Sequence, residues 1–283
     1  MKASVVIVTT GDRPAALARA ISSVDAQRGA EIDRILVANG AEAEAAAGWR
    51  VVRLEHNVGP AAARNRAVAQ ATGDVAFFLD DDASYPDEGL VARALDRFRV
   101  EPQLGILSFR IDNPEGRTHQ RRHVPRLRAG DPTRSSEVTT FLEGACAIRA
   151  EAFARAGGYP EAFFFGHEGT DLAWRAIDAG YRVRYAGDLV VNHPAEPPTR
   201  HGDFHRLTAR NRVLVARRLL PLPLKVIYVS VWVILGLARA RSSRALRDLV
   251  SGFREGLGMP VERRPISWRA VWRMTRAGRP PVV

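Results

Sequence analysis

The 283 residues include 42 Lys and Arg against 31 Asp and Glu, which gives a net charge of +11 at pH 7, and a single cysteine, Cys146. This length is sufficient for one large α/β domain, or for a domain with an appendage, that buries a sizeable core. A single cysteine excludes an intrachain disulfide and fits a reducing compartment.

The positive charge is concentrated in the last part of the chain. Residues 199–283 contain 18 Lys and Arg and 4 Asp and Glu, a net charge of +14, which leaves −3 for the first 198 residues. This asymmetry predicts an acidic partner for the C-terminal segment, either an anionic membrane or nucleic acid. The first apolar residues are soon interrupted by Gly11, which predicts an opening strand rather than a signal peptide.

Apolar strand-like runs alternate with helical patterns over the first 111 residues. Strands are expected at 4–9, 34–38, 51–54, 75–79 and 105–111, with a helix after Asp12, one at 61–71 and one through 90–98. This alternation predicts an α/β fold with a doubly wound, mainly parallel central sheet flanked by helices. The sequence has neither the P-loop nor the dinucleotide-binding glycine signature, which disfavours both of those enzyme classes.

Three consecutive aspartates, Asp80, Asp81 and Asp82, directly follow the apolar run 75–79. Parallel sheets bury such strands on both faces and place ligands at their carboxyl ends. Adjacent carboxylates repel one another unless a cation or a set of donors holds them, and hard divalent ions such as Mg²⁺ bind carboxylate and phosphate oxygens together. The run therefore predicts a site for a metal ion and a diphosphate. The alternative is an acidic turn that caps the next helix.

A second informative block covers residues 141–193. A small-residue strand is expected at 144–148, followed by a helix that ends at Gly157-Gly158, an aromatic run and another helix that begins near Glu168. A carboxylate in this first turn is stabilised by the helix dipole and can serve as a base or as a cap. For Asp171, capping or pairing with Arg175 is favoured. Between the two blocks, residues 112–138 lack periodicity and predict a loop, either a cover over an anionic substrate or a solvated insertion.

The order of these motifs resembles family 2 glycosyltransferases of the GT-A fold. The matching features are Asn57-x-Gly59 and Ala63-Arg64-Asn65, the strand before Asp-x-Asp, the small-residue strand, the Gly-Gly-aromatic turn and the acidic helix start. The similarity covers roughly residues 4–220 and implies a GT-A-like domain over 1–200, with a nucleotide-binding half at 1–111 and an acceptor half at 139–200. It also implies a nucleotide-sugar donor, Mg²⁺ or Mn²⁺, and inversion at the anomeric carbon.

The same resemblance implies roles for individual residues. By position, the nucleotide-binding residues would be Thr9, Arg13, Asn39, Arg64, Asp80 and Asp81, and the metal-binding residues would be Asp82, Asp80 and His193. Asn39 lies where the family usually has an aspartate-rich turn that contacts the base. The family commonly has Glu-Asp at the acidic helix start, and this chain has Glu168-Gly169. Glu168 is therefore the expected catalytic base, with small Gly169 leaving room for the acceptor, and Asp171 and His167 are the alternatives.

The segment 201–283 predicts a basic, partly amphipathic helical tail. The apolar run 226–238 has 13 residues without a charge, fewer than the ~20 needed to span a bilayer. It suits a helix on the membrane surface or one that packs on the domain. A peripheral position at the cytoplasmic face of an anionic membrane is preferred, and nucleic acid is the less favoured partner.

The expected function is inverting transfer of a sugar to a hydroxyl group of a glycan or lipid-linked acceptor, in polysaccharide, cell-wall or glycolipid synthesis. Two alternatives are kept. One is a sugar nucleotidyltransferase, although such enzymes usually have a Gly-rich, Lys-containing loop where this chain reads Thr-Thr-Gly-Asp-Arg. The other is a non-catalytic module with a degenerate acidic site, whose tail binds anionic lipid or nucleic acid.

Overall fold

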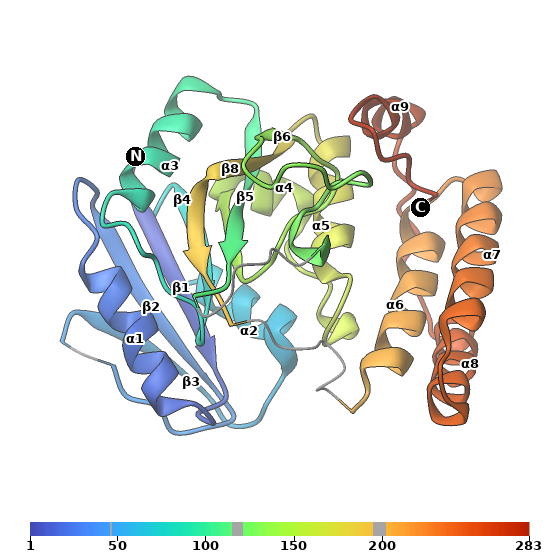
Figure 1. The fold of residues 1–283 in the computed structure, drawn as a ribbon, viewed down its shortest axis with the longest axis horizontal. Coiled ribbons are helices and arrows are strands. Elements are labelled where there is room, and N and C mark those ends of the chain that lie inside the picture. The colour runs from blue at the N-terminus through green and yellow to red at the C-terminus, as the bar shows by residue number, and fades with distance from the viewer. Residues whose placement is uncertain (46, 115–120, 195–201, 283) are drawn as a thin grey trace.

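A computed structural model of the chain describes residues 1–45, 47–114, 121–194 and 202–282. Within these residues the chain forms one eight-stranded sheet in the order β3-β2-β1-β4-β7-β5-β8-β6 (Figure 1). The strands are β1 (Ala3–Thr9), β2 (Ile32–Asn39), β3 (Trp49–Leu54), β4 (Val75–Asp80), β5 (Leu104–Asp112), β6 (Ser136–Glu137), β7 (Ala145–Arg149) and β8 (Arg182–Asn192).

Most neighbouring strands in this sheet are parallel. Strand β1 pairs in parallel with β2 and β4, β2 with β3, and β5 with β8. Strand β7 runs antiparallel between β4 and β5, and β6 pairs antiparallel with β8. The predicted α/β fold with a mainly parallel sheet is therefore confirmed, and the antiparallel β7 joins its two parallel parts.

Helices cover both faces of the sheet because strand side chains alternate between them. Those of the first half are α1 (Pro14–Asp25), α2 (Gly59–Val68), α3 (Leu90–Val100), α4 (Ala150–Ala156) and α5 (Glu168–Asp178). On β4, Phe77 packs in the core shared with α1 and α3, whereas Phe78 packs in the core shared with α2, α4 and α5. Helix α2 begins and ends two to three residues before the expected 61–71.

The C-terminal helices form a layer on the α5 side of the molecule (Figure 1). They are α6 (Phe204–Leu219), α7 (Leu222–Arg239), α8 (Ser243–Gly258) and α9 (Trp268–Arg276). Leu214 of α6, Tyr228 of α7 and Met274 of α9 are buried in the same core as α5. The tail therefore packs against the α5 side of the sheet domain, and the domain boundary near residue 200 stays a prediction. Helix α9 lies within the predicted helical tail, but no separate helix is predicted at this position from the sequence.

The loop expected at 112–138 contains little regular structure where it is described. A short 3₁₀ helix (Arg121–His123) and β6 interrupt it, and residues 115–120 of the prediction lie outside the described residues.

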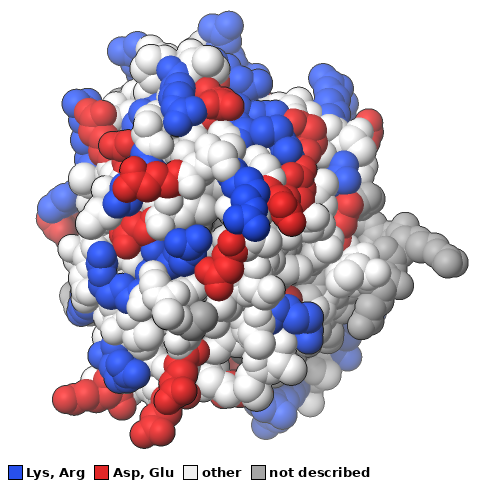
Figure 2. Space-filling view, turned by 90° about the vertical axis from the view of Figure 1, so that its left-hand side faces the viewer, with Lys and Arg blue, Asp and Glu red and all other residues white. Residues whose placement is uncertain are grey.

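Figure 2 shows the face of the molecule that lies on the left in Figure 1, on the side of α1 and β3. Basic and acidic side chains are interspersed over this face, without a large patch of one sign. The face thus offers no concentrated attraction for an anionic partner, in keeping with the small net charge of the first 198 residues.

Candidate active site at the carboxyl edge of the sheet

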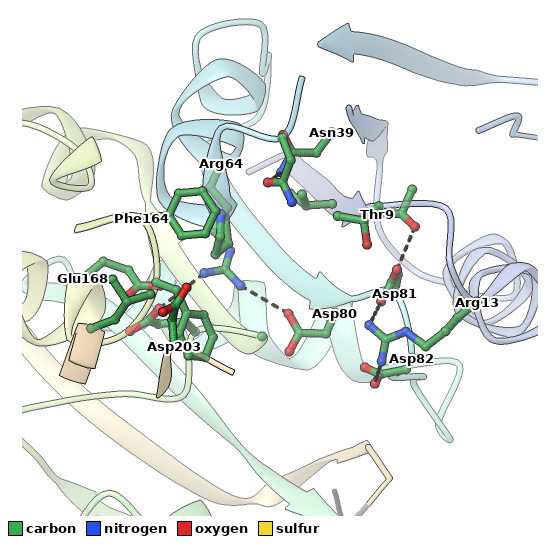
Figure 3. Close-up of a pocket in the computed structure, with 18 of the residues that line it drawn as sticks. Thr9, Arg13, Asn39, Arg64, Asp80, Asp81, Asp82, Phe164, Glu168 and Asp203 are labelled. Atoms are coloured by element: carbon green, nitrogen blue, oxygen red, sulfur yellow. Dashed lines mark hydrogen bonds and ion pairs between the residues drawn. The ribbon is translucent and has the colours of Figure 1, made fainter. Parts of the chain in front are cut away.

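A pocket of about 460 Å³ lies where β1, β2 and β4 end (Figure 3). Of the residues predicted from the sequence, Thr9, Arg13, Asn39, Arg64, Asp80, Asp81, Asp82 and Glu168 line it. Asp171 and His193 do not line the pocket, although His193 contacts two residues that do. Further residues line the pocket to which the sequence assigned no role in the site, among them Glu143, Phe164, Asp203 and Leu207.

Asp80, Asp82 and His193 form a compact group beside the pocket. His193 Nε2 lies 3.6 Å from Asp80 Oδ2 and 3.2 Å from Asp82 Oδ1. One ligand atom from each residue falls within 4.8 Å of the others. Burial opposes a charge on His193, but hydrogen bonds and charges of the two aspartates raise its pKa to about 10. This raised pKa favours a protonated imidazole, which would stabilise the two neighbouring carboxylates as long as no metal ion is bound.

This group also fits a divalent cation. Two carboxylate oxygens and one imidazole nitrogen are ligands that Mn²⁺ accepts, and the carboxylates alone suit Mg²⁺. Burial raises the pKa of Asp80, but His193 and Arg64 lower it to about 2, so this carboxylate is ionised at neutral pH. Asp80 reaches its position because Gly144 has no side chain. A Cβ at Gly144 would lie 1.8 Å from Asp80 Oδ2.

Thr9 and Arg13 hold the other aspartates from the end of β1. Thr9 Oγ1 donates a hydrogen bond of 2.7 Å to Asp81 Oδ2, and Arg13 Nη2 lies 2.6 Å from Asp81 Oδ1 (Figure 3). The second guanidinium nitrogen of Arg13 contacts Asp82. Burial raises the pKa of Asp81, which Thr9 and Arg13 partly offset. The geometry thus makes Asp81 a residue that orients Arg13, while Asp82 faces both Arg13 and His193.

Asn39 lines the pocket, but its amide group is used within the protein. Its Nδ2 donates to Asn57 Oδ1 at 3.0 Å, and its Oδ1 accepts from the backbone N–H of Val58 at 3.0 Å. These bonds tie the end of β2 to the turn before α2. A contact between Asn39 and a nucleotide base stays a prediction.

Arg64 connects the aspartates to a pair of glutamates on the opposite wall. Its guanidinium lies 3.2 Å from Asp80 Oδ1 and 3.3 Å from Glu143 Oε2 (Figure 3). Glu143 lies just before β7, and its Oε1 accepts a 2.7 Å hydrogen bond from the backbone N–H of Gly169. The only sequence signal for Glu143 is a charged residue ahead of a buried strand.

The expectation that Gly169 leaves room for an acceptor is wrong. A Cβ at this position would lie 2.4 Å from Glu143 Oε1, so the missing side chain makes room for the Glu143 carboxylate. The second carboxylate of the pair therefore comes from the start of β7 instead of the residue after Glu168. Any larger residue at 169 would displace Glu143 from this position.

Glu168 and Asp171 have different environments, although both are buried on the first turn of α5. Burial and the neighbouring Glu143 raise the pKa of Glu168 well above its usual value. Asp171 instead accepts from Arg175 at 2.7 Å and from Arg218 at 3.0 Å. This matches the structural role that the sequence favoured for Asp171, and the pairing with Arg218 ties α6 to α5.

The loop before Glu168 is held by α6, a contact that the sequence did not predict. Asn211 Nδ2 donates to the carbonyls of Phe163, Phe165 and Gly166 at 2.9, 2.8 and 2.7 Å. In this loop Phe164 and His167 both have a positive φ, which few non-glycine residues adopt. The buried amide of Asn211 therefore fixes the strained loop that positions Glu168 in the pocket.

Comparison with curated proteins adds relatives for the N-terminal half. The chain is 32% identical over 153 residues to a pre-mycofactocin glycosyltransferase of Mycobacterium tuberculosis, which covers 50% of this chain and 32% of that protein. It is 28% identical over 148 residues to the glycosyltransferase AglE of Haloferax volcanii, covering 49% and 45% of the two chains. The matched region thus spans less than half of either relative.

Solved structures show the same fold at low sequence identity. The first 349 residues of Staphylococcus aureus TarS superpose with a TM-score of 0.64 at 14% identity, over 91% of this chain and 80% of that one. The mannosyltransferase PcManGT of Pyrobaculum calidifontis, solved with GDP-Man and Mn²⁺, gives 0.58 at 17% identity over 98% and 84%. GalNAc-T7, solved with UDP, GalNAc and Mn²⁺, gives 0.63 at 17% identity over 92% and 55%. The fold is that of GT-A glycosyltransferases.

The family model of glycosyl transferase family 2 matches residues 4–157, which is more than half of the chain and runs from β1 through β4 and its aspartates to β7 and α4. On this match and on the fold, the chain belongs to glycosyl transferase family 2.

Proposed function

We propose that this protein is a metal-dependent inverting glycosyltransferase, which transfers a sugar from a nucleotide-diphosphate sugar to a hydroxyl group of a glycan or lipid-linked acceptor. The observation that carries the proposal is one pocket with two acidic walls. Asp80 and Asp82 line one side and form, with the adjacent His193, a group that could hold a cation, and Glu143 and Glu168 line the other side. Family membership and relatives solved with UDP, UDP-GlcNAc or GDP-Man support a nucleotide-sugar donor.

The proposed reaction assigns each wall of the pocket a task. A divalent ion held by Asp80, Asp82 and His193 would supply positive charge to the departing diphosphate. Arg13 and Arg64 line the same pocket and would bind phosphate oxygens as negative charge develops on them. Glu168, across the pocket, would take the proton of the acceptor hydroxyl. Direct displacement by that hydroxyl, without an enzyme-bound sugar, inverts the anomeric carbon.

The test is a panel of UDP-, GDP- and dTDP-sugars with and without Mn²⁺ or Mg²⁺. One donor should raise the melting temperature only with metal, because a ligand that binds the folded state stabilises it by mass action. The same donor should release its nucleoside diphosphate slowly in water. Pyrophosphate exchange with a nucleoside triphosphate would instead indicate a sugar nucleotidyltransferase. Binding without turnover, across acceptors, would indicate a non-catalytic module.

We further propose that the C-terminal layer docks on the cytoplasmic surface of an anionic membrane. Helix α7 exposes a row of apolar side chains: Leu222, Val226, Ile227, Ile234 and Leu237. It is the one helix of the described residues that is long and apolar enough to span a bilayer, with 18 residues of which only 6% are buried. However, α6 and α8 pack beside it and carry arginines such as Arg217 and Arg247. These charges favour a helix that lies on the membrane over one that crosses it.

The membrane proposal predicts reversible, salt-sensitive binding. The +14 charge of residues 199–283 should attract anionic lipid by on the order of 1 kcal/mol for each arginine near the surface, and salt screens this attraction. Flotation with phosphatidylglycerol-containing vesicles should fall steeply between low and high ionic strength, and vesicles of phosphatidylcholine alone should bind weakly. Equal flotation with both lipids would exclude the electrostatic contribution.

A further inference from the structure

The tail contains a partly buried arginine, Arg212, whose Nε atom is fully buried and which has no anionic partner within the described residues. The guanidinium of Arg212, on α6, stacks on the ring of Trp232, on α7, at 3.8 Å. Arg212 Nε and Trp232 Nε1 are both buried, and neither has a hydrogen-bond partner within the described residues. Over the same residues, no carboxylate lies within ion-pair distance of Arg212. Buried N–H donors are nearly always satisfied, so this pair indicates a missing acceptor.

The charged groups around Arg212 are also cationic. Burial together with the charges of Arg239 and Arg279 lowers the pKa of Arg212 to about 10, although Tyr228 opposes this shift. Burial and the charges of Arg212 and Arg279 also keep the pKa of His167 well below its usual value, so this histidine is neutral. A bound anion would therefore find a positive field and two unused donors. Such a site has the electrostatics of a phosphate-binding site.

Arg212 and Trp232 line a pocket of about 180 Å³ between α6, α7 and α8. The rest of its lining is largely apolar, from Phe204, Leu235, Gly236, Ala240 and Leu249, with His205, Thr208 and Arg239 as the other polar members. Ile234 and Leu237 of α7, which flank the lining residues Leu235 and Gly236 in the sequence, are exposed. A pocket that combines cationic and N–H donors with largely apolar walls fits a ligand with both an anionic group and an apolar chain better than it fits a free ion.

The position of this pocket relates it to the candidate active site. Asp203, just before α6, and Leu207 on α6 line the active-site pocket, whereas Phe204 and Thr208 of α6 line the tail pocket. The two pockets thus lie on different sides of the same helix.

We propose that the pocket between α6, α7 and α8 binds the phosphate group of a membrane lipid, with Arg212 and Trp232 as hydrogen-bond donors and the apolar walls in contact with the first carbons of its chains. This site extends the proposed membrane docking, because it adds recognition of one headgroup to general attraction by surface charge. It does not depend on sugar transfer, so the two proposals can fail separately.

The test uses the full chain and a short-chain lipid phosphate below its micelle concentration. Dihexanoyl phosphatidic acid is titrated calorimetrically, in parallel with inorganic phosphate and with dihexanoylglycerol. The lipid phosphate should bind at least tenfold more tightly than either of the other two, because only it supplies both the anion and the apolar chains. Equal binding of inorganic phosphate would show a free-phosphate site, and equal binding of dihexanoylglycerol would show an apolar pocket. Either result overturns the proposal.

Two variants and a matched control locate the binding. Arg212→Gln should weaken lipid-phosphate binding by roughly tenfold or more, since hydrogen bonds to a charged group contribute about 1.5–3 kcal/mol. Trp232→Phe keeps the ring and removes only the N–H, and should weaken binding by about three- to tenfold. Arg244→Gln removes the same charge from an exposed residue of α8 and should change the affinity less than about twofold.

The pattern among the variants decides the outcome. Similar weakening by Arg212→Gln and Arg244→Gln would show only a diffuse effect of charge, and an unchanged affinity in Trp232→Phe would remove the assigned donor. Both results contradict the proposal. Binding of a nucleoside diphosphate with Mn²⁺, measured on the same samples, should be the same in all four proteins, and thermal unfolding confirms that each is folded. If Arg212→Gln does not fold, Trp232→Phe still tests the site.

Discussion

Asp82→Asn should remove divalent-metal-dependent binding of nucleoside diphosphates and leave the protein folded. The side chain of Asp82 is only 4% exposed. Its carboxylate contacts Arg13, and its Oδ1 lies 3.2 Å from His193 Nε2. Burial opposes its ionisation, but the His193 hydrogen bond and charge hold its pKa below the usual value. An amide keeps the shape of the side chain and loses the charge that a hard cation requires. Metal affinity should fall by roughly 10²-fold or more, and diphosphate affinity with it.

The measurement is titration calorimetry of Mn²⁺, and of UDP and GDP with and without Mn²⁺, together with a melting curve. Asp188→Asn is the matched control, because Asp188 is an exposed carboxylate paired with Arg97 outside the pocket. The control should retain wild-type affinities. If Asp82→Asn binds the metal and the diphosphate as tightly as the wild type, Asp82 is not a metal ligand and the proposed cation site is misplaced.

The sheet and its acidic edge could be predicted from the sequence because their signals are local. The buried run before Asp80 and the alternation of strands and helices each depend on residues a few positions apart. The carboxyl ends of parallel strands meet at one edge, so Thr9 and Asp82 could be expected in one pocket before their contacts were known. Even the helix break at Gly157-Gly158 follows from local turn chemistry, since both glycines have positive φ.

The other wall of the pocket could not be predicted, because its contacts join residues far apart in the sequence. Glu143 is hydrogen-bonded to Gly169, 26 positions later in the sequence, and Asn211 is hydrogen-bonded to the carbonyl of Phe163, 48 positions earlier. No periodicity or motif records such pairs, and a single sequence shows only that position 169 is small. The packing of α9 within the predicted helical tail could not be predicted for a related reason. Its buried face, with Ala270 and Met274, contacts a core formed mainly by distant elements.

Glu168→Gln should lower kcat by roughly 10²-fold or more and leave donor affinity little changed, if Glu168 takes the proton of the acceptor. The substitution keeps the size of the side chain and removes its basicity. Glu168 lines the pocket, and Asn211 holds the loop that precedes it. A general base works best when its pKa lies close to the working pH, and burial with the nearby Glu143 raises the pKa of Glu168 in that direction.

The raised pKa gives this prediction a pH signature. The ionised, basic form of Glu168 appears only as the pH rises through its raised pKa, so kcat should increase with pH over a range above that of an ordinary carboxyl group. Glu143→Gln removes a neighbouring negative charge, which should shift this rise to lower pH while turnover is retained. Asp178→Asn, on the last turn of α5 and away from the pocket, is the control and should leave the profile unchanged.

These pH profiles also separate the two glutamates. Glu143 is the more exposed carboxylate of the pair and lies 3.3 Å from Arg64, so it is the natural competitor for the role of base. If Glu143→Gln loses turnover while Glu168→Gln retains it, the base is Glu143, and Glu168 only modulates its charge. If both variants lose turnover and the pH profile changes in both, the two carboxyl groups share one proton and titrate as a unit. In each case Gly169 is the residue that permits the arrangement, because only glycine leaves space for Glu143 beside Glu168.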